Sequence, residues 1–366
     1  MKIGVLTGGG DCPGLNPAIR GFVMRAIDYG DECWGLRDGW RGLVENLVES
    51  EPLTVGRVEE IIRQGGTMLG SSRTNPFKKG QEADLEKCLR NIRSNRFDVI
   101  AALGGDDTLG VANRLYHEHG IKTVGIPKTM DNDLSETDYT FGFDSAVAVA
   151  TDALDRLKDT AKSHSRVMVL EVMGRHAGWV ALYTGIAGGA DWILMPEQME
   201  PADSKASDAA TQRSQKLEAE LKEMAQHLKA ARARGKNYGL IVVSEGVQAP
   251  TQSEAAAKVD SFGHVILAEQ GIGRYVAQWI ESKTGFETRD ASIGHIQRGG
   301  APTVFDRVLA TRLGVKAADC VHEGQFGVMV ATRGNEIVAV DLRKAVGISK
   351  TVPLSLYNEL KTLFNK

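Results

Sequence analysis

The chain has 366 residues, of which 42% are hydrophobic and 25% charged, and this length and composition fit a globular protein of about two domains. Its formal net charge of -3 gives no basic surface for nucleic acid, so an anionic ligand must be bound by local arginines and lysines. No apolar run approaches the ~18 residues that a membrane span needs. We therefore expect neither nucleic acid nor a membrane as a partner.

The cysteines indicate a reducing compartment. Cys12, Cys33, Cys88 and Cys320 are scattered and show no C-x-x-C spacing, which argues against a zinc site or a disulfide framework. The N-terminus enters a strand at once, without a charged and then apolar leader. We expect free thiols and a cytoplasmic location.

The first predicted strand, Ile3–Leu6, runs into the glycine-rich stretch 8–14, and a helix is predicted to begin near Asn16. Glycines let backbone N–H groups approach an anion closely, and a helix N-terminus adds its dipole. The stretch matches neither G-x-G-x-x-G nor a P-loop. A phosphate site and a tight strand–helix turn both remain open for it.

The strand predicted at Phe97–Leu103 ends in Gly104-Gly105-Asp106-Asp107-Thr108, before a helix over Leu109–His119. One aspartate would suffice to cap that helix. A second adjacent carboxylate costs repulsion unless a cation lies nearby. The pair therefore favours magnesium, a hard cation that oxygen atoms hold.

The next predicted strand, Lys122–Ile126, leads into Pro127-Lys128-Thr129-Met130-Asp131-Asn132-Asp133. A carboxylate at this position can take the proton from a sugar hydroxyl, while Lys128 and Thr129 can bind a moving phosphoryl group. The alternative is a polar turn built from Asp and Asn. Together with the preceding loops, the pattern favours phosphoryl transfer.

The second half of the chain repeats the alternation of strand and helix. A crossing point is predicted at 141–144, and a new set of strands begins at Arg166–Glu171. The segment 201–236 has apolar residues at helical spacing and Gly235 at its end, which predicts an amphipathic helix that packs on the body or on a subunit. Alternating strands and helices indicate a parallel α/β sheet whose polar strand ends converge on one cleft.

Four cationic residues of this half form a second candidate set, namely Arg166, Arg289, His295 and Arg298. Arginine forks bind phosphate through two parallel hydrogen bonds, so a convergence of several would hold a phosphomonoester. His295 and Arg298 lie in a glycine-rich polar motif, Gly294 to Gly300, that is unlike a core strand end.

Taken together, the motifs resemble the 6-phosphofructokinase family over essentially the whole chain. The resemblance rests on the order and spacing of five motifs: Gly8 to Asn16, Gly104-Gly105-Asp106, Pro127 to Asp133, Met173-Gly174-Arg175 and Gly294 to Gly300. It implies two similar three-layer α/β domains with mostly parallel sheets and an active site in the cleft between them. Residues 1–142 with 297–345 would bind the phosphoryl donor and Mg²⁺, and residues 143–296 with 346–366 would bind fructose 6-phosphate.

The resemblance also implies a role for each matching residue. Asp131 would be the general base on the sugar 1-hydroxyl with Asp133 beside it, Asp106 would organise Mg²⁺, and Gly10 would contact the transferring phosphoryl group through its backbone. Arg73 and Arg175 would stabilise that group, Thr129 would contact it, and Thr129, Asp131 and Arg175 would also bind the sugar phosphate. The remaining fructose 6-phosphate ligands would be Met173, Gly174, Glu245, His295 and Arg298, with Arg166 and Arg289 entering from a neighbouring subunit of a homodimer or homotetramer.

Asp107 and Lys128 distinguish between phosphate donors. ATP-using members of the family commonly carry glycine at the first position and many carry it at the second, whereas Asp with Lys is typical of pyrophosphate-dependent members. A side chain at 107 occupies space that a nucleotide α-phosphate needs, and Lys128 can neutralise the short pyrophosphate. We therefore expect a pyrophosphate-dependent, reversible phosphorylation of fructose 6-phosphate in glycolysis or gluconeogenesis.

Two alternatives remain. An ATP-dependent 6-phosphofructokinase would share every acceptor residue. A non-catalytic regulatory subunit or sugar-phosphate sensor would be expected to lose the Asp131 and Asp133 pair or the arginines, and the sequence retains them.

Overall fold

The structure is a computed structural model that describes residues 1–201, 203, 207–249 and 271–363. It divides into two compact units. Among the described residues, unit 1 comprises Met1–Ser145 and Arg298–Ser349, and unit 2 comprises the remainder. The functional roles assigned above to two domains stay a prediction, and parts of the predicted ranges lie outside the described residues.

Unit 1 is built on a six-stranded sheet with the order β10-β9-β4-β3-β1-β2. Its strands are β1 (Lys2–Thr7), β2 (Glu32–Leu36), β3 (Val99–Gly104), β4 (Thr123–Pro127), β9 (Val328–Arg333) and β10 (Glu336–Asp341). All neighbouring pairs are parallel except the hairpin of β9 and β10. Because β1, β3 and β4 are adjacent and parallel, the polar loops that follow them lie at the same edge of the sheet.

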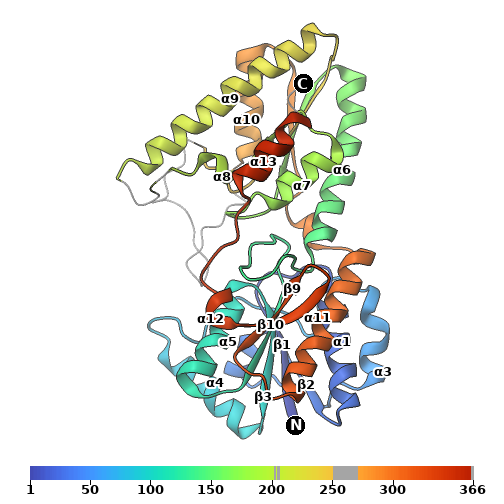
Figure 1. Ribbon diagram of the computed structural model, residues 1–366, viewed down its shortest axis with the longest axis vertical. Coiled ribbons are helices and arrows are strands. Elements are labelled where there is room, and N and C mark those ends of the chain that lie inside the picture. Colours follow the sequence, from blue (N-terminus) through green and yellow to red (C-terminus); the bar gives the residue numbers. More distant parts are fainter. Residues whose placement is uncertain (202, 204–206, 250–270, 364–366) are drawn as a thin grey trace. The chain divides into compact units, whose positions relative to one another are not determined.

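Helices cover both faces of this sheet (Figure 1). One face packs against α2 (Trp40–Val44), α4 (Glu82–Ser94), α5 (Asp106–His119) and α12 (Leu342–Ala345). The other is covered by α1 (Leu15–Asp28) and α11 (Val304–His322), while α3 (Val55–Val58) and η1 (Glu59–Arg63) pack against α1. Strand residues alternate between the two layers, as a period of two requires. Helices α1 and α11 approach closely at Gly21, where an added Cβ would lie 2.5 Å from the carbonyl oxygen of Thr311.

Unit 2 is built on a four-stranded parallel sheet with the order β6-β7-β5-β8. Its strands are β5 (Val167–Val172), β6 (Trp192–Leu194), β7 (Gly239–Ser244) and β8 (Thr288–Ser292). Its helices are α6 (Phe143–His164), α7 (Trp179–Gly188), α8 (Pro196–Met199), α9 (Ala209–Ala233), α10 (Ile272–Thr284), η4 (Gly294–Arg298), α13 (Leu354–Leu360) and η5 (Lys361–Leu363), of which α6 begins in the last residues of unit 1.

The core of unit 2 shows why 201–236 has its apolar spacing. Four residues of α9 are buried in the core cluster that also contains Val167 and Ile241 of the sheet, namely Leu217, Leu221, Met224 and Leu228. The predicted amphipathic helix is therefore confirmed as α9, and it packs on the body of its own unit. Residues 202 and 204–206 of the predicted segment lie outside the described residues.

Three further features of the structure bear on the sequence analysis. All four cysteines are buried and unpaired. Within the described residues, no helix combines the length and hydropathy that a membrane span needs. The α/β class with mostly parallel sheets is confirmed.

Candidate active site

The glycine loop after β1 presents backbone rather than side chains. The N–H of Gly8 donates to Leu103 O at 2.9 Å, and that of Gly9 donates to Ser72 O at 3.0 Å. A Cβ at Gly8 would lie 2.6 Å from Thr108 Oγ1. Gly9 has a φ of 78°, which glycine adopts without strain. The start of the loop is thus held tightly through backbone hydrogen bonds, and Gly9 and Gly10, which are only half-buried, are the part of it that an anion could approach.

Two cations lie against Gly10. The buried Lys128 donates from Nζ to Gly10 O at 2.5 Å, and Arg298 Nη1 donates to the carbonyl oxygen of Asp11 at 3.1 Å. A Cβ at Gly10 would lie 2.8 Å from Arg298 Nη1. A side chain at position 10 would therefore require the Arg298 guanidinium to shift, and the peptide group of Gly10 lies in a positive environment. The structure brings Arg298, predicted as a sugar-phosphate ligand, next to the predicted donor loop.

Gly10 and Arg73 line the same hollow of about 490 Å³, together with Ser71 and Ser72. Ser71 Oγ donates to Gly9 O at 2.5 Å and so ties two lining residues of the hollow together. Arg73 is exposed at its side. Two of the predicted ligands of the transferring phosphoryl group are thus brought together.

Asp106 and Asp107 follow the end of β3 but do not cap the helix. Helix α5 begins at Asp106 and its N-cap is Gly105, so both carboxylates stand in the first turn, where the helix dipole stabilises negative charge. The alternative interpretation, in which one aspartate caps the helix after this strand, is therefore wrong. Asp106 is exposed, and its Oδ1 accepts the N–H of Gly347 at 2.6 Å, whereas Asp107 is half-buried.

Asp131 lies buried in the segment that follows β4. Its N–H donates to Thr129 Oγ1 at 3.1 Å, and its Oδ2 accepts from the same hydroxyl at 3.4 Å. Its Oδ1 is buried and has no hydrogen-bond partner among the described residues. A buried carboxylate oxygen without a donor is costly, and such an atom is suited to accept a proton from a substrate.

Asn132 fixes the turn beside this carboxylate. Its φ is 51°, a left-handed conformation that Asn tolerates better than most residues. Its Oδ1 accepts the N–H of Thr140 at 3.1 Å, and Thr140 Oγ1 donates to Thr129 O at 2.7 Å. The segment is thereby closed on itself. Asp133, which follows, is half-buried.

In unit 2, the loop after β5 has its N–H groups held by side chains. Met173 N–H donates to Gln297 Oε1 at 2.8 Å, and the N–H groups of Gly174 and Arg175 both point at Glu245 Oε1, at 3.4 and 3.3 Å. Arg175 has a φ of 50°. Four residues predicted to bind the sugar phosphate are therefore brought together, because Glu245 contacts the loop that carries the other three.

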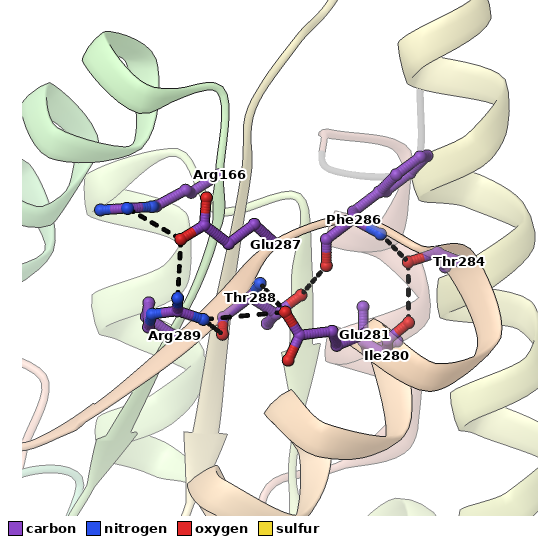
Figure 2. A network of polar contacts seen from close by, with 8 residues as sticks. All are labelled: Arg166, Ile280, Glu281, Thr284, Phe286, Glu287, Thr288 and Arg289. Atoms are coloured by element: carbon purple, nitrogen blue, oxygen red, sulfur yellow. Dashed lines mark hydrogen bonds and ion pairs between the residues drawn. The ribbon is translucent and has the colours of Figure 1, made fainter.

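Arg166 and Arg289 also lie together, on a different part of unit 2. Figure 2 shows both guanidinium groups directed at Glu287, each with an N–O distance of 2.7 Å. Arg289 lies 3.7 Å from Glu281 as well. The hydrogen bond from Arg166 lowers the pKa of Glu287 below its ordinary value. The two arginines are thus held as a pair at the exposed edge strand β8.

One predicted ligand is not brought to the others. His295 lies exposed on η4, and the structure does not place it against the other candidates within the described residues.

Some site features were not found from the sequence. A hollow of about 500 Å³ beside Gly246 is lined by His176, Glu197 and Val352, none of them predicted. Thr108, which packs on Gly8, and Gln297, which holds Met173, were also missed. Both stand inside motifs that had been recognised, but only burial reveals what they do.

The described residues contain no group of three or more His, Cys, Asp or Glu side chains placed to bind a metal. Mg²⁺ is commonly held by one or two carboxylates, and phosphate oxygens complete its shell. Asp106 and Asp107 supply carboxylate oxygens of this kind at the first turn of α5, so the residues present fit such an ion.

Comparison with known proteins shows which family this architecture and these loops belong to. A sequence profile described as Phosphofructokinase matches residues 2–321. The chain therefore belongs to the phosphofructokinase family.

Three relatives illustrate the similarity. The chain is 50% identical to a pyrophosphate–fructose 6-phosphate 1-phosphotransferase of Dictyoglomus thermophilum, over 100% of this chain and 99% of that protein. It is 44% identical to an ATP-dependent 6-phosphofructokinase of Streptomyces coelicolor, over 98% of each. Its fold is similar to the solved structure of phosphofructokinase from Saccharomyces cerevisiae, with a TM-score of 0.76 and 28% identity over 99% of this chain and 48% of that one. This chain thus spans about half the length of the yeast chain.

Proposed function

We propose that this protein transfers a phosphoryl group reversibly from pyrophosphate to the 1-hydroxyl of D-fructose 6-phosphate, as a diphosphate–fructose-6-phosphate 1-phosphotransferase. The observation that carries the choice of donor is the pair Asp107 and Lys128, which follow the adjacent strands β3 and β4. The relative from Dictyoglomus thermophilum, named for this reaction, supports the choice.

In the proposed reaction, Asp131 takes the proton of the 1-hydroxyl as its oxygen attacks the terminal phosphorus of pyrophosphate. The bond from that phosphorus to the bridging oxygen breaks, and orthophosphate leaves. Negative charge on the phosphoryl group in the transition state would be offset by Lys128, Thr129 and the peptide group of Gly10. When bound, Mg²⁺ would neutralise phosphate charge, and Asp106 would hold it.

The sugar phosphate would be held by the loop of Met173, Gly174 and Arg175 with Glu245 beneath it. Arg73 and Arg175 would stabilise the transferring group, and Asp133 would support Asp131. His295, Arg298 and the paired arginines 166 and 289 would bind the phosphomonoester, since several guanidinium forks match its oxygens. Free buried thiols suit a reducing compartment, and we place the reaction in the cytoplasm.

The test of the donor is a comparison of pyrophosphate and ATP at saturating Mg²⁺ with fructose 6-phosphate. Wild-type protein should use pyrophosphate and have little activity with ATP. Asp107→Gly should raise kcat/KM for ATP by at least about tenfold, ~1.4 kcal/mol of transition-state binding, and lower it for pyrophosphate. Lys128→Gly alone should weaken pyrophosphate use without creating much ATP activity. Wild-type protein that prefers ATP would support the ATP-dependent alternative instead.

We further propose that the active form is a homodimer or homotetramer. Unit 2 presents Arg166 and Arg289 at an edge strand, and α11 leaves Val304, Phe305 and Val308 exposed by 77%, 47% and 54%. Neighbouring exposed apolar side chains are typical of an interface.

Mixing two inactive variants tests this assembly. If Arg166 serves a neighbouring site, Arg166→Ala chains mixed with Asp131→Asn chains should regain activity, because some hybrid sites combine two intact halves. Each variant mixed with itself is the control. A fully active monomer by light scattering would contradict the assembly.

A further inference from the structure

We infer that Gln297 is a positioning residue whose buried side-chain amide sets the shape of the sugar-phosphate loop, Met173–Arg175, without contacting the substrate. The inference rests on the proposed function, because it assumes that this loop binds fructose 6-phosphate.

The first step is the position of Met173 at the end of the sheet. Val167 N–H donates to Glu287 O, and Ile293 N–H donates to Glu171 O, so the odd-numbered residues of β5 face β8. With a period of two, the N–H of Met173 faces the same side. Strand β8 ends at Ser292, and a side chain therefore has to supply the next acceptor.

Gln297 supplies it. This residue of η4 is 0% exposed. Its Oε1 accepts the N–H of Met173 at 2.8 Å, and its Nε2 donates to Ala146 O in α6 at 3.4 Å. An N–H group requires the amide oxygen and a carbonyl group requires the amide nitrogen, so only one orientation of the amide satisfies both partners. The side chain thus ties three elements of unit 2 together: η4, the end of β5 and the first turns of α6.

The next two N–H groups of the loop are held from elsewhere. Gly174 and Arg175 donate to Glu245, and Arg175 has a left-handed backbone that persists only where surrounding contacts enforce it. Without an acceptor at Gln297, the buried N–H of Met173 would have to move toward another one. The two contacts to Glu245 would then change as well.

This arrangement predicts an effect on one substrate only. Met173 and Gly174 are assigned to the sugar phosphate, and Arg175 is assigned to it and, during transfer, to the moving phosphoryl group, whereas the ligands that bind pyrophosphate before transfer, Gly10, Arg73 and Lys128, belong to unit 1. A displaced loop should weaken binding of fructose 6-phosphate and leave pyrophosphate binding unchanged. A purely structural role would lower the thermal midpoint and would not discriminate between substrates.

The experiment compares Gln297→Met, which keeps the volume and removes the acceptor, with Gln297→Glu, which keeps an oxygen for Met173. Gln198→Met is the matched control, since Gln198 Oε1 also accepts a backbone N–H, that of Met195 at 2.6 Å in the same unit. The Kd of fructose 6-phosphate is measured by calorimetry without a donor, and both KM values are measured in the full reaction.

Gln297→Met should raise the Kd and KM for fructose 6-phosphate about tenfold, equivalent to ~1.4 kcal/mol, with KM for pyrophosphate within about twofold of wild type. Gln297→Glu should lie closer to wild type than Gln297→Met, and Gln198→Met should change neither constant. An unchanged Kd in Gln297→Met, an equal rise for both substrates, or an equal defect in the Glu variant would overturn the positioning role alone. Wild-type protein that does not bind fructose 6-phosphate would overturn the proposed function and, with it, this inference.

Discussion

The segment 129–132 in unit 1 and the loop 173–178 in unit 2 both come after a parallel strand, yet they are held in opposite ways. In the first, the functional side chains hold one another and nearby backbone, as the bonds between Thr129 and Asp131 show. In the second, the backbone is functional, and acceptors from other elements hold it. The first is a local structure and the second depends on long-range partners.

The partners of the second loop are far away in the chain. Gly178 N–H donates to Glu197 Oε1, 19 residues on, whereas Glu245 stands 71 residues from Gly174 and Gln297 stands 124 from Met173. Burial raises the pKa of Glu197 above its ordinary value, and the same oxygen accepts the N–H of Val352. We therefore expect the segment in unit 1 to lose its function when one of its own side chains is changed. The loop 173–178, called the braced loop below, should lose its function when the residues around it are changed.

The strongest test of the local segment is Asp131→Asn. The amide keeps the shape but cannot take the hydroxyl proton, so kcat should fall by roughly 10²–10⁴ with little change in KM for fructose 6-phosphate. Steady-state kinetics with pyrophosphate measures this. Asp138→Asn, the same change at an exposed carboxyl of the same unit, is the control. A kcat within a factor of a few of wild type would mean that Asp131 is not the base.

The braced loop should instead be sensitive to an added methyl group outside it. A Cβ at Gly246 would lie 1.7 Å from the carbonyl oxygen of Arg175, and a backbone atom cannot move aside cheaply. Gly246→Ala should reduce kcat/KM for fructose 6-phosphate by about 10²-fold, since a misplacement of about 1 Å can have that effect. Gly56→Ala is the matched control, because no atom lies within 4 Å of its added Cβ. Normal kinetics in Gly246→Ala would show that the loop tolerates displacement.

The same contrast explains what could be predicted from the sequence. The segment Pro127 to Asp133 was recognised because its chemistry is contiguous, and the parallel α/β fold was recognised because strands and helices alternate locally. Gln297 was not recognised, although it stands between two predicted ligands, His295 and Arg298. Nothing in the sequence indicates that a glutamine within a polar motif is buried. Its partner Met173 is brought to it only when the sheet folds.

A smaller effect is expected from Asp306, a buried carboxyl of unit 1. Its Oδ2 accepts the N–H and the hydroxyl of Ser145 at 2.8 and 2.6 Å, and burial raises its pKa to about 6. The raised pKa favours the protonated form in the folded state. Its stabilising contribution is therefore complete below the unfolded value of about 4 and is lost as pH rises to about 6.

Asp306→Asn cannot ionise. The unfolding free energy of wild type minus that of this variant should therefore decline by on the order of 2 kcal/mol between pH 4 and 7. Above pH 7 this difference should stay constant. Thermal midpoints of both proteins across this pH range measure it. Asp341→Asn is the control, because Arg343 lowers the pKa of Asp341 to about 2. Its contribution is lost only as pH falls toward that value. A difference for Asp306→Asn that does not vary with pH would contradict the raised pKa.

The four buried thiols have a practical consequence. Burial raises the pKa of Cys12, Cys33 and Cys88 to about 12 and that of Cys320 to about 11, and the thiolate is the form that alkylating reagents and peroxide attack. The native protein should therefore resist both at neutral pH, even at Cys12 inside the glycine loop. Labelling of any thiol would report opening of the structure around it. All four cysteines belong to unit 1. The rate at which they are modified would therefore measure how often that unit unfolds, without an added label.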